Sequence, residues 1–298
     1  MVKSLSNSFD IICFEGNGAS YTTLQELSAG KADIWIAVTE SDELNILSCM
    51  TAHMMGAKHT IARIRDVDYA RQNHFYKDKL GLSMIINPEL ATALEIFRLL
   101  RFPLATRVET FARGRAELVQ INVRNESPLI GHSLIEMNQD MGINLLICAI
   151  VRDGEAFVPK GNTVISRGDI LYMTGAADEF RKSFKKIKLP VKPLQSVMIA
   201  GGGRIAYYLA EAVLEQGAKV TLIEKNKVMA TELSEAVEGI NVVCDDALAY
   251  FDSMSQSDIE NTDAFITITD NDEYNLVAAM YGESQGCLLY TSPSPRDA

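Results

Sequence analysis

The residues with the clearest chemical meaning are three consecutive glycines at the start of the segment GGGRIA (201–206). The segment fits the pattern G-x-G-x-x-[GA] and stands between an apolar run, SVMIA, and a predicted helix. Gly201 permits the tight turn, Gly203 lets a pyrophosphate approach the backbone, and Ala206 lets the helix pack against the strand. The free N–H groups of the helix start favour phosphate binding. The alternative is a structural glycine turn without a ligand.

An acidic residue completes this pattern. Glu224 ends the next predicted strand, 18 residues after Ala206 (224 − 206). A carboxylate there accepts hydrogen bonds from a ribose diol and repels a 2′-phosphate, which favours NAD over NADP and also fits the ribose of ATP. The order of strand, glycine turn, helix, strand and acid therefore predicts a nucleotide site.

Further candidates follow other predicted strands, where ligands sit in a doubly wound sheet. Two pairs of residues stand at such positions, Thr269 with Asp270 and Thr39 with Glu40. Each pair either contacts the ribose or nicotinamide part of a ligand or forms the turn that starts the next helix, and one pair can do both. Three more residues carry the same ambiguity between ligand contact and turn chemistry, and they are Asp245, Gly16 and Gly18.

Two arginines alternate with apolar residues in the run HTIARIR (59–65). Alternation on a strand places Arg63 and Arg65 on one face. They either meet nucleotide phosphates or form salt bridges on the strand surface.

The inventory of catalytic groups is poor. The sequence has no G-x-S-x-G segment, and no His lies in the last block, where a dehydrogenase would need an acid or base near the nicotinamide. We expect His132, which follows Gly131, to be a surface residue. The four His and five Cys show no metal-ligand spacing, so we predict neither an enzyme nor a metal site.

Composition narrows the partners. The net charge is −11, from 28 Lys and Arg against 39 Asp and Glu, which argues against nucleic-acid binding. The odd number of Cys without a CxxC pair suits reduced intracellular thiols. No apolar run approaches the ~20 residues of a spanning helix. We therefore expect a soluble protein that reaches a membrane only through a partner.

The chain reads as three blocks. In the first, strands at 9–14, 32–38 and 59–65 alternate with helices, which predicts a parallel sheet, and Asn87 and Pro88 start a helix. The stripe of that helix expected to be buried comprises Leu90, Leu94, Phe97 and Leu100. The middle block has strand-like runs between turns and predicts a small α+β module. The basic segment 180–193 looks like a linker, and the last block is α/β again.

The first and last blocks repeat one another. WIAVTESDELNIL (35–47) aligns with FITITDNDEYNLV (265–277), so that Thr39 corresponds to Thr269 and Asn45 to Asn275, an offset of 230 (269 − 39). FDIIC (9–13) similarly matches INVVC. This predicts a duplication. At that offset the first copy has no glycine turn, so we expect one βαβ unit to be missing before it, with a strand edge left exposed and a less stable fragment.

These segments together resemble the family of regulatory subunits of Trk-type potassium uptake systems, whose nucleotide-binding domains are of the RCK type. The resemblance rests on the glycine segment with Glu224, the repeated VTESDELN and ITDNDEYN, ARIRDVDY, and SPLIGHSL with GDILYMTG, and it covers about residues 1–286. It implies duplicated Rossmann-like domains separated by a regulatory domain. The expected domains are 1–103 (first nucleotide-binding), 104–189 (regulatory), 194–286 (second nucleotide-binding, incomplete) and 287–298 (a non-native tail).

The resemblance also implies ligands and partners. It implies NAD(H), with ATP or ADP as further ligands, and a cytoplasmic homotetramer docked at the inner face of the plasma membrane under an integral membrane potassium-transporting subunit. The residues implied to hold nucleotide in the second copy are Gly201, Gly202, Gly203, Arg204, Ile205, Glu224, Thr269 and Asp270. In the first copy they are Thr39, Glu40 and Arg63, with Arg65 reaching a phosphate across a subunit contact.

Two segments of this chain depart from the pattern of the family. The first copy lacks the glycine turn and its acid, so its site should be impaired, and the tail CLLYTSPSPRDA departs from the family, so the fifth strand of the second copy should be missing. The alternatives to allosteric regulation are an NAD-dependent oxidoreductase, a regulatory domain of a potassium or proton antiporter, and a scaffold without ligand.

Overall fold

The computed structural model describes residues 10–101, 105–111, 116–125, 127–186, 194–285 and 288–291. The chain divides into two compact units, Met1–Ala91 and Thr92–Ala298. The described residues form three sheets, one in the first unit and two in the second, and each sheet has its own hydrophobic core. The predicted boundary at residue 103 lies outside the described residues.

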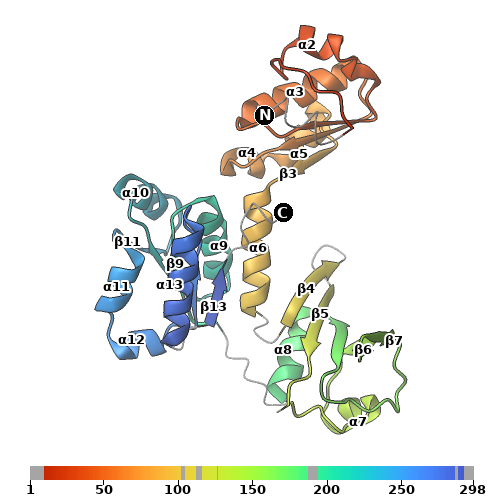
Figure 1. Cartoon of the computed structure of the whole chain (residues 1–298), viewed down its shortest axis with the longest axis vertical. Helices are drawn as coiled ribbons and strands as arrows, with labels where there is room; N and C mark the ends of the chain where they lie inside the picture. Colours follow the sequence, from red (N-terminus) through yellow and green to blue (C-terminus); the bar gives the residue numbers. More distant parts are fainter. Residues whose placement is uncertain are drawn as a thin grey trace. The chain divides into compact units, whose positions relative to one another are not determined.

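The first of the two repeats predicted from the sequence is a parallel sheet of order β1-β2-β3 with helices between the strands (Figure 1). Its elements are α2 (Tyr21–Glu26), the 3-10 helix η1 (Ala29–Lys31), β1 (Ile34–Ala37), α3 (Asp42–Met55), β2 (His59–Arg63), α4 (Val67–Arg71), α5 (Asn73–Leu80), β3 (Met84–Ile86) and α6 (Pro88–Arg101). The parallel sheet with helices between its strands was predicted from the sequence. Cys49 and Ala62 are buried between α3 and the sheet.

Two predictions for this repeat are wrong. Residues 10–14, the described part of the expected first strand, are not a strand, and Ile12 and Phe14 are exposed there. A strand needs a neighbour to hydrogen-bond with, and this segment has none in the described sheet. Strand β2 ends at Arg63, so Arg65 lies beyond the strand and does not alternate with Arg63 on its face.

Helix α6 begins as the sequence predicts. The side chain of Asn87 accepts a hydrogen bond from the Leu90 N–H at 2.9 Å. Its buried stripe differs from the prediction: Ala93, Ile96 and Leu100 are buried, so of the four expected residues only Leu100 is a buried one. The spacing of apolar residues alone does not decide which of two adjacent stripes is buried, because this helix carries apolar residues on more than one face.

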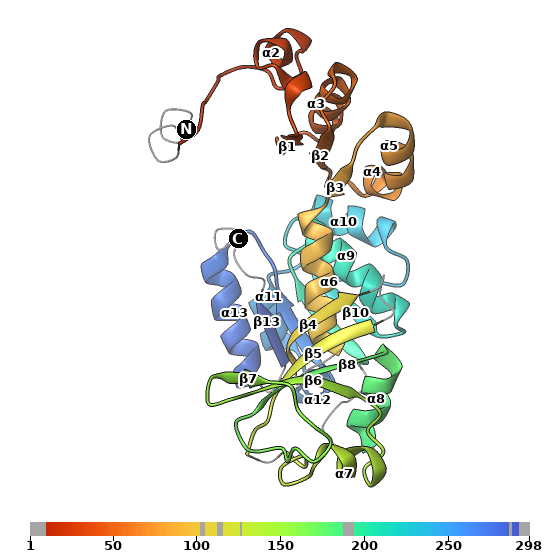
Figure 2. The same cartoon turned by 90° about the vertical axis from the view of Figure 1, so that its right-hand side faces the viewer.

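The middle module is an antiparallel sheet of order β4-β5-β8-β6-β7, and Figure 2 shows its strands side by side. Its elements are β4 (Ala105–Phe111), β5 (Ala116–Asn122), α7 (Leu134–Gln139), β6 (Leu146–Arg152), β7 (Glu155–Phe157), β8 (Ile170–Gly175) and α8 (Ala177–Lys186). Fully buried Asp169 takes two hydrogen bonds from the Arg152 guanidinium, at 2.7 and 2.8 Å. This ion pair joins β6 to the start of β8.

The expected linker 180–193 is wrong in its first half. Residues 180–186 belong to α8, and Phe180 and Phe184 are buried in the core of the module. The many basic residues of this segment suggested an exposed linker. The two phenylalanines lie one helical turn apart, however, and both pack into the core, which anchors the helix. Residues 187–193 lie outside the described part of the chain.

The second repeat has the strand order β11-β10-β9-β12-β13, with all neighbouring strands parallel (Figure 1). Its elements are β9 (Ser196–Ala200), α9 (Arg204–Glu215), β10 (Lys219–Ile223), α10 (Lys227–Ala236), β11 (Asn241–Val243), α11 (Ala247–Ser253), α12 (Gln256–Glu260), β12 (Ala264–Thr267), α13 (Asp272–Ser284) and β13 (Leu288–Thr291). The duplicated Rossmann-like fold is thus confirmed. The expected absence of a fifth strand is wrong, because β13 pairs with β12.

Among the described residues, no helix is long and apolar enough to cross a membrane.

Candidate functional site

The glycine turn joins β9 to α9 as the sequence predicts. Gly201 has φ +107°, a backbone conformation that residues with a side chain rarely adopt. A Cβ atom at Gly201 would lie 2.7 Å from the carbonyl oxygen of Ile268 and 2.9 Å from the nitrogen of Thr269. Gly201 is therefore needed both for the turn and for close contact with the end of β12.

Glu224 contacts this turn directly. One oxygen of its carboxylate accepts a hydrogen bond from the Gly202 N–H at 2.6 Å, and the other accepts from the Asn226 N–H at 2.6 Å. A Cβ atom at Gly202 would lie 2.9 Å from the Glu224 side chain, so glycine makes this approach possible. Each carboxylate oxygen can accept a second hydrogen bond, and a ribose hydroxyl can supply it.

The start of α9 is open. Gly203 is the N-cap residue, has no side-chain cap, and has no atom within 4 Å of where its Cβ would be. The N–H groups of the first helical turn are therefore available to an anion, and the helix dipole favours negative charge there. Arg204 is exposed at the first position of the helix, Ile205 is half-buried, and Ala206 is buried against the sheet.

Thr269 lies in the turn between β12 and α13. Its hydroxyl donates to Asn275 Oδ1 at 2.7 Å, and its N–H donates to the same oxygen at 2.9 Å. The helix cap itself is Asn271, whose side chain accepts from the Tyr274 N–H. Asp270 is exposed beside it. Thr269 therefore belongs to the turn that starts α13, which is one of its two predicted roles. The close approach of the Thr269 nitrogen to Gly201 also places Thr269 next to the glycine turn.

At the end of β11, the engaged carboxylate is Asp246 rather than Asp245. Asp246 caps α11 by accepting from the N–H groups of Leu248 and Ala249, and it accepts from the Tyr274 hydroxyl at 3.1 Å. Burial acts to raise the pKa of Asp246, but these hydrogen bonds outweigh it and hold the pKa below its ordinary value. Asp245 is exposed, and its side chain accepts a hydrogen bond from the Asp246 N–H at 2.8 Å.

Sequence reasoning did not select Asp246. The signal that could have found it is its place directly before the helix ALAYFDS, where an Asp is a favoured N-cap.

In the first repeat, the four predicted residues surround the end of one strand pair. Asn45 Nδ2 donates to the carbonyl oxygens of Thr39 and Arg63, at 3.1 and 2.9 Å. The Arg65 guanidinium donates to the Glu40 carbonyl oxygen. Thr39, Glu40, Arg63 and Arg65 therefore lie close together, held by backbone contacts.

Both arginines of this cluster already have acidic neighbours. The Arg63 guanidinium lies 3.5 Å from Glu89 Oε1. The Arg65 guanidinium lies 3.5 Å from Asp42 Oδ1, and the other carboxylate oxygen, Asp42 Oδ2, accepts a hydrogen bond from the Arg65 backbone N–H. The salt-bridge interpretation of these arginines is realised, and a phosphate would have to compete with these carboxylates.

The predicted glycines of the first repeat do not form a phosphate loop in the described residues. The carbonyl oxygen of Gly18 accepts from the Ser48 hydroxyl at 2.6 Å, and Gly16 lies against the side chain of Thr23. Helix α2, which follows them, also has no side-chain cap at Ser20, but the sequence before it does not have the glycine pattern found at Gly201–Gly203.

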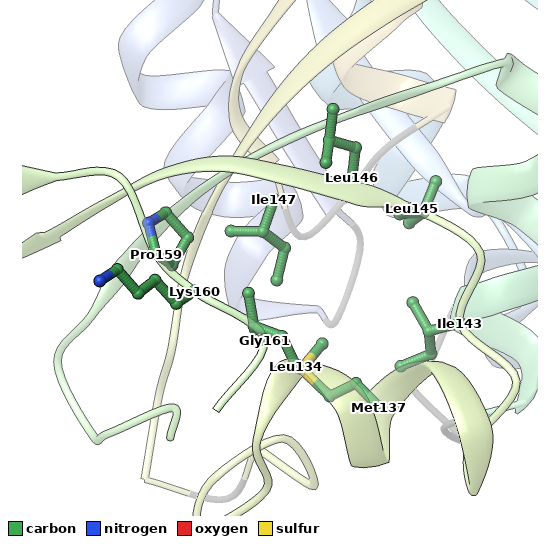
Figure 3. A pocket seen from close by; sticks show the side chains of 9 residues that line it. All are labelled: Leu134, Met137, Ile143, Leu145, Leu146, Ile147, Pro159, Lys160 and Gly161. Carbon is green, nitrogen blue, oxygen red and sulfur yellow. The ribbon is translucent and has the colours of Figure 1, made fainter. Parts of the chain in front are cut away.

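The middle module holds a separate small pocket of about 270 Å³ between α7, β6 and the loop at 159–161 (Figure 3). Its lining is apolar except for Lys160, whose ammonium extends away from the apolar side chains in Figure 3. Within the described residues there is no cluster of His, Cys, Asp and Glu that could hold a metal ion.

Comparisons with known proteins identify the family of this chain. The model of the TrkA-N domain matches residues 1–88 and again 197–289, and the model of the TrkA-C domain matches residues 118–188. This chain belongs to the TrkA family. The two separate matches to one domain model confirm the duplication predicted from the repeat.

Individual relatives carry names from potassium transport. The chain is 32% identical over 289 residues to the "Trk system potassium uptake protein TrkA" of Vibrio alginolyticus, covering 96% of this chain and 63% of that protein. It is 29% identical over 283 residues to the "Trk system potassium uptake protein TrkA homolog" of Archaeoglobus fulgidus, covering 95% of this chain and 64% of that protein. The chain thus spans less than two thirds of the length of these relatives, whose names describe them as potassium uptake proteins.

Solved structures show the same fold. The structure titled "GsuK Channel" aligns with a TM-score of 0.68 at 16% identity, covering 97% of this chain and 51% of that chain. The structure titled "GsuK channel bound to NAD" aligns with a TM-score of 0.63, covering 98% of this chain and 55% of that chain. At this identity the likeness concerns the fold alone.

Proposed function

We propose that this chain is a nucleotide-sensing regulatory part of a potassium uptake system and that its second repeat binds NAD(H), or ATP or ADP. The observation that carries the proposal is the open start of α9 at Gly203 beside the fixed carboxylate of Glu224. A helix start that can bind an anion suits the phosphates of an adenosine nucleotide, and a carboxylate next to it suits the hydroxyl groups of the ribose. Membership in the TrkA family connects such a site to potassium uptake.

Each group has a defined part in this proposal. The phosphates would lie against the N–H groups at Gly203, Arg204 and Ile205, and the ribose diol would donate to Glu224. A 2′-phosphate would bring negative charge onto Glu224, so NADP should bind more weakly than NAD. Thr269 and Asp270 border the same turn. Asp245 would contribute from the neighbouring strand end.

The first repeat would contribute less. Thr39, Glu40, Arg63 and Arg65 lie together, but the described residues around them offer no glycine turn, and Glu89 and Asp42 already neighbour the arginines. We therefore expect the second repeat to account for most nucleotide binding by this chain. Arg65 would reach a phosphate of a neighbouring subunit only after leaving the Glu40 carbonyl oxygen.

The regulatory step would be allosteric. A nucleotide that binds one conformation of the assembly more tightly shifts the equilibrium toward it, by no more than the difference between its affinities for the two states. The partner would be an integral membrane potassium-transporting subunit, and the assembly would be a homotetramer at the inner face of the plasma membrane.

Calorimetric titration tests the binding step. The purified chain is titrated with NAD, NADH, NADP, ATP and ADP, beside Glu224→Ala and the matched control Glu238→Ala, an exposed acid of the same domain. Glu224→Ala should weaken NADH binding about tenfold or more, because it loses charge-assisted hydrogen bonds. Glu238→Ala should bind like the wild type. Absence of saturable binding to the wild-type chain would contradict the proposal.

Potassium flux tests the regulatory step. In vesicles that contain the complete transporter and its full-length regulatory subunit, NADH and ATP should change the flux. A flux that ignores both nucleotides, from a complex that binds them, would leave the binding step standing and refute the regulatory one.

A further inference from the structure

The two repeats share a buried asparagine that neither the glycine pattern nor the strand-end acids pointed to. Asn45 is fully buried on the first turn of α3, and Asn275 is 8% exposed at the matching place on α13. In each repeat, Oδ1 accepts from the N–H and the hydroxyl of the threonine at the preceding strand end, Thr39 or Thr269. The same side chain donates through Nδ2 to the carbonyl oxygen of that threonine.

In the second repeat, these bonds fix the backbone on both sides of one residue. The Thr269 N–H donates at 2.9 Å, its hydroxyl donates at 2.7 Å, and its carbonyl oxygen accepts at 2.8 Å. Because Asn275 is almost fully buried, water cannot replace these partners without opening the helix start, and buried groups left without partners are costly. Thr269 therefore has little freedom to move while Asn275 is present.

The fixed backbone is also the surface against which the glycine turn packs. The carbonyl group of Ile268 and the nitrogen of Thr269 are the atoms that a Cβ at Gly201 would meet, at 2.7 to 2.9 Å. Gly201 in turn leads to Gly202, whose N–H is bound by Glu224, and to Gly203 at the open helix start. A continuous set of contacts thus runs from Asn275 through the 268–269 peptide to the turn.

We propose that Asn275 is a positioning residue of the nucleotide site, which sets the position of the Gly201–Gly203 turn by fixing the 268–269 peptide. This inference rests on the proposed function of the second repeat. Asn45 makes the matching hydrogen bonds in the first repeat, where the described residues include no such glycine turn. Asn45 therefore serves as a control that reproduces the local structural role without the positioning role.

The experiment uses Asn275→Ala, Asn275→Asp and Asn45→Ala in the full chain, with two measurements. Hydrogen exchange is followed for the peptide that covers residues 199–206, and the Kd for NADH is measured by calorimetry. In Asn275→Ala, exchange at the turn should be about tenfold faster and the Kd about tenfold higher, the loss expected for one to two buried hydrogen bonds. Asn45→Ala should change neither value.

The conservative variant Asn275→Asp distinguishes a loss of the position of the turn from a general loss of folding. Asn275→Asp keeps an acceptor for the Thr269 N–H and hydroxyl but loses the donor to the Thr269 carbonyl oxygen. It should therefore retain part of the protection of the turn. If Asn275→Ala does not fold, Asn275→Asp supplies both measurements, and faster exchange at 199–206 with a higher Kd remains the expected result.

The failures are distinguishable. If the wild-type chain does not bind NADH, the proposed function fails, whereas exchange at 199–206 still decides whether Asn275 positions the turn. If a folded Asn275 variant shows the exchange and the Kd of Asn45→Ala, Asn275 only anchors its helix and the inference is overturned.

Discussion

Replacement of Gly203 by Ala should abolish most nucleotide binding without unfolding the second repeat. Gly203 has φ −72° and ψ −179°, which Ala adopts without strain, and no atom lies within 4 Å of the added Cβ. The small loss of N-cap preference is offset by the lower entropy of the unfolded chain, so stability should stay within about 1 kcal/mol of the wild type.

The binding loss follows from where the methyl group would stand. It would occupy the open space through which phosphate oxygens approach the N–H groups of α9. Loss of one charge-assisted hydrogen bond, at about 1.5–3 kcal/mol, corresponds to roughly a 10- to 100-fold higher Kd for NADH. Calorimetry measures the Kd, and urea unfolding followed by circular dichroism measures stability. The fluorescence of Trp35, the only tryptophan, reports on the first repeat as an internal control.

Gly201→Ala is the matched contrast. Its φ of +107° and a Cβ 2.7 Å from the Ile268 carbonyl oxygen should destabilise the second repeat by more than about 2 kcal/mol. A folded Gly203→Ala protein that binds NADH with wild-type affinity would show that phosphates do not lie at this helix start. Equal destabilisation by the two substitutions would show that the space around Gly203 is not open.

Three further predictions concern stability and reactivity. Asp169→Ala should destabilise the middle module by about 1.5–3 kcal/mol in urea unfolding, because Arg152 and the Ser166 N–H lose the charged acceptor that they share; a loss below about 0.5 kcal/mol would contradict this. The pKa of Asp246 lies below its ordinary value of 3.8, so its stabilising effect is complete above that pH and is lost as the pH falls toward the lower folded-state pKa. Melting temperatures from pH 7 to pH 3 should accordingly fall less steeply in Asp246→Asn. Burial raises the pKa of Cys49 to about 11, so Cys49 should resist a thiol reagent at pH 8 while exposed Cys244 reacts, and mass spectrometry of the labelled peptides checks this.

The sequence predicted the second repeat well because its chemistry is local. The glycine turn, the helix after it and Glu224 fall within 24 residues (201–224), and each has a residue type that only a few backbone conformations or ligands explain. The duplication was visible for a similar reason, since Thr39 and Asn45 recur at a constant offset.

The sequence-based predictions were wrong or incomplete where contacts between residues distant in the chain determine the structure. Residues 10–14 have an apolar pattern typical of a strand but no neighbour to pair with in the described sheet. Asn275 was visible as a repeated residue, yet its role depends on bonds to Thr269 and on a glycine turn more than 70 residues earlier in the chain. No spacing rule connects these positions.

The two hydrogen bonds that Glu224 already accepts have a kinetic consequence. The carboxylate is fixed before any ligand arrives, and a ribose hydroxyl would add a bond to it without breaking the bonds to Gly202 and Asn226. Little rearrangement would then precede binding, so association would be limited by encounter and not by a slow opening step. Occupancy of such a site would then relax to a new nucleotide concentration at the sum of the encounter-limited association rate and the dissociation rate, with no added delay from a conformational step.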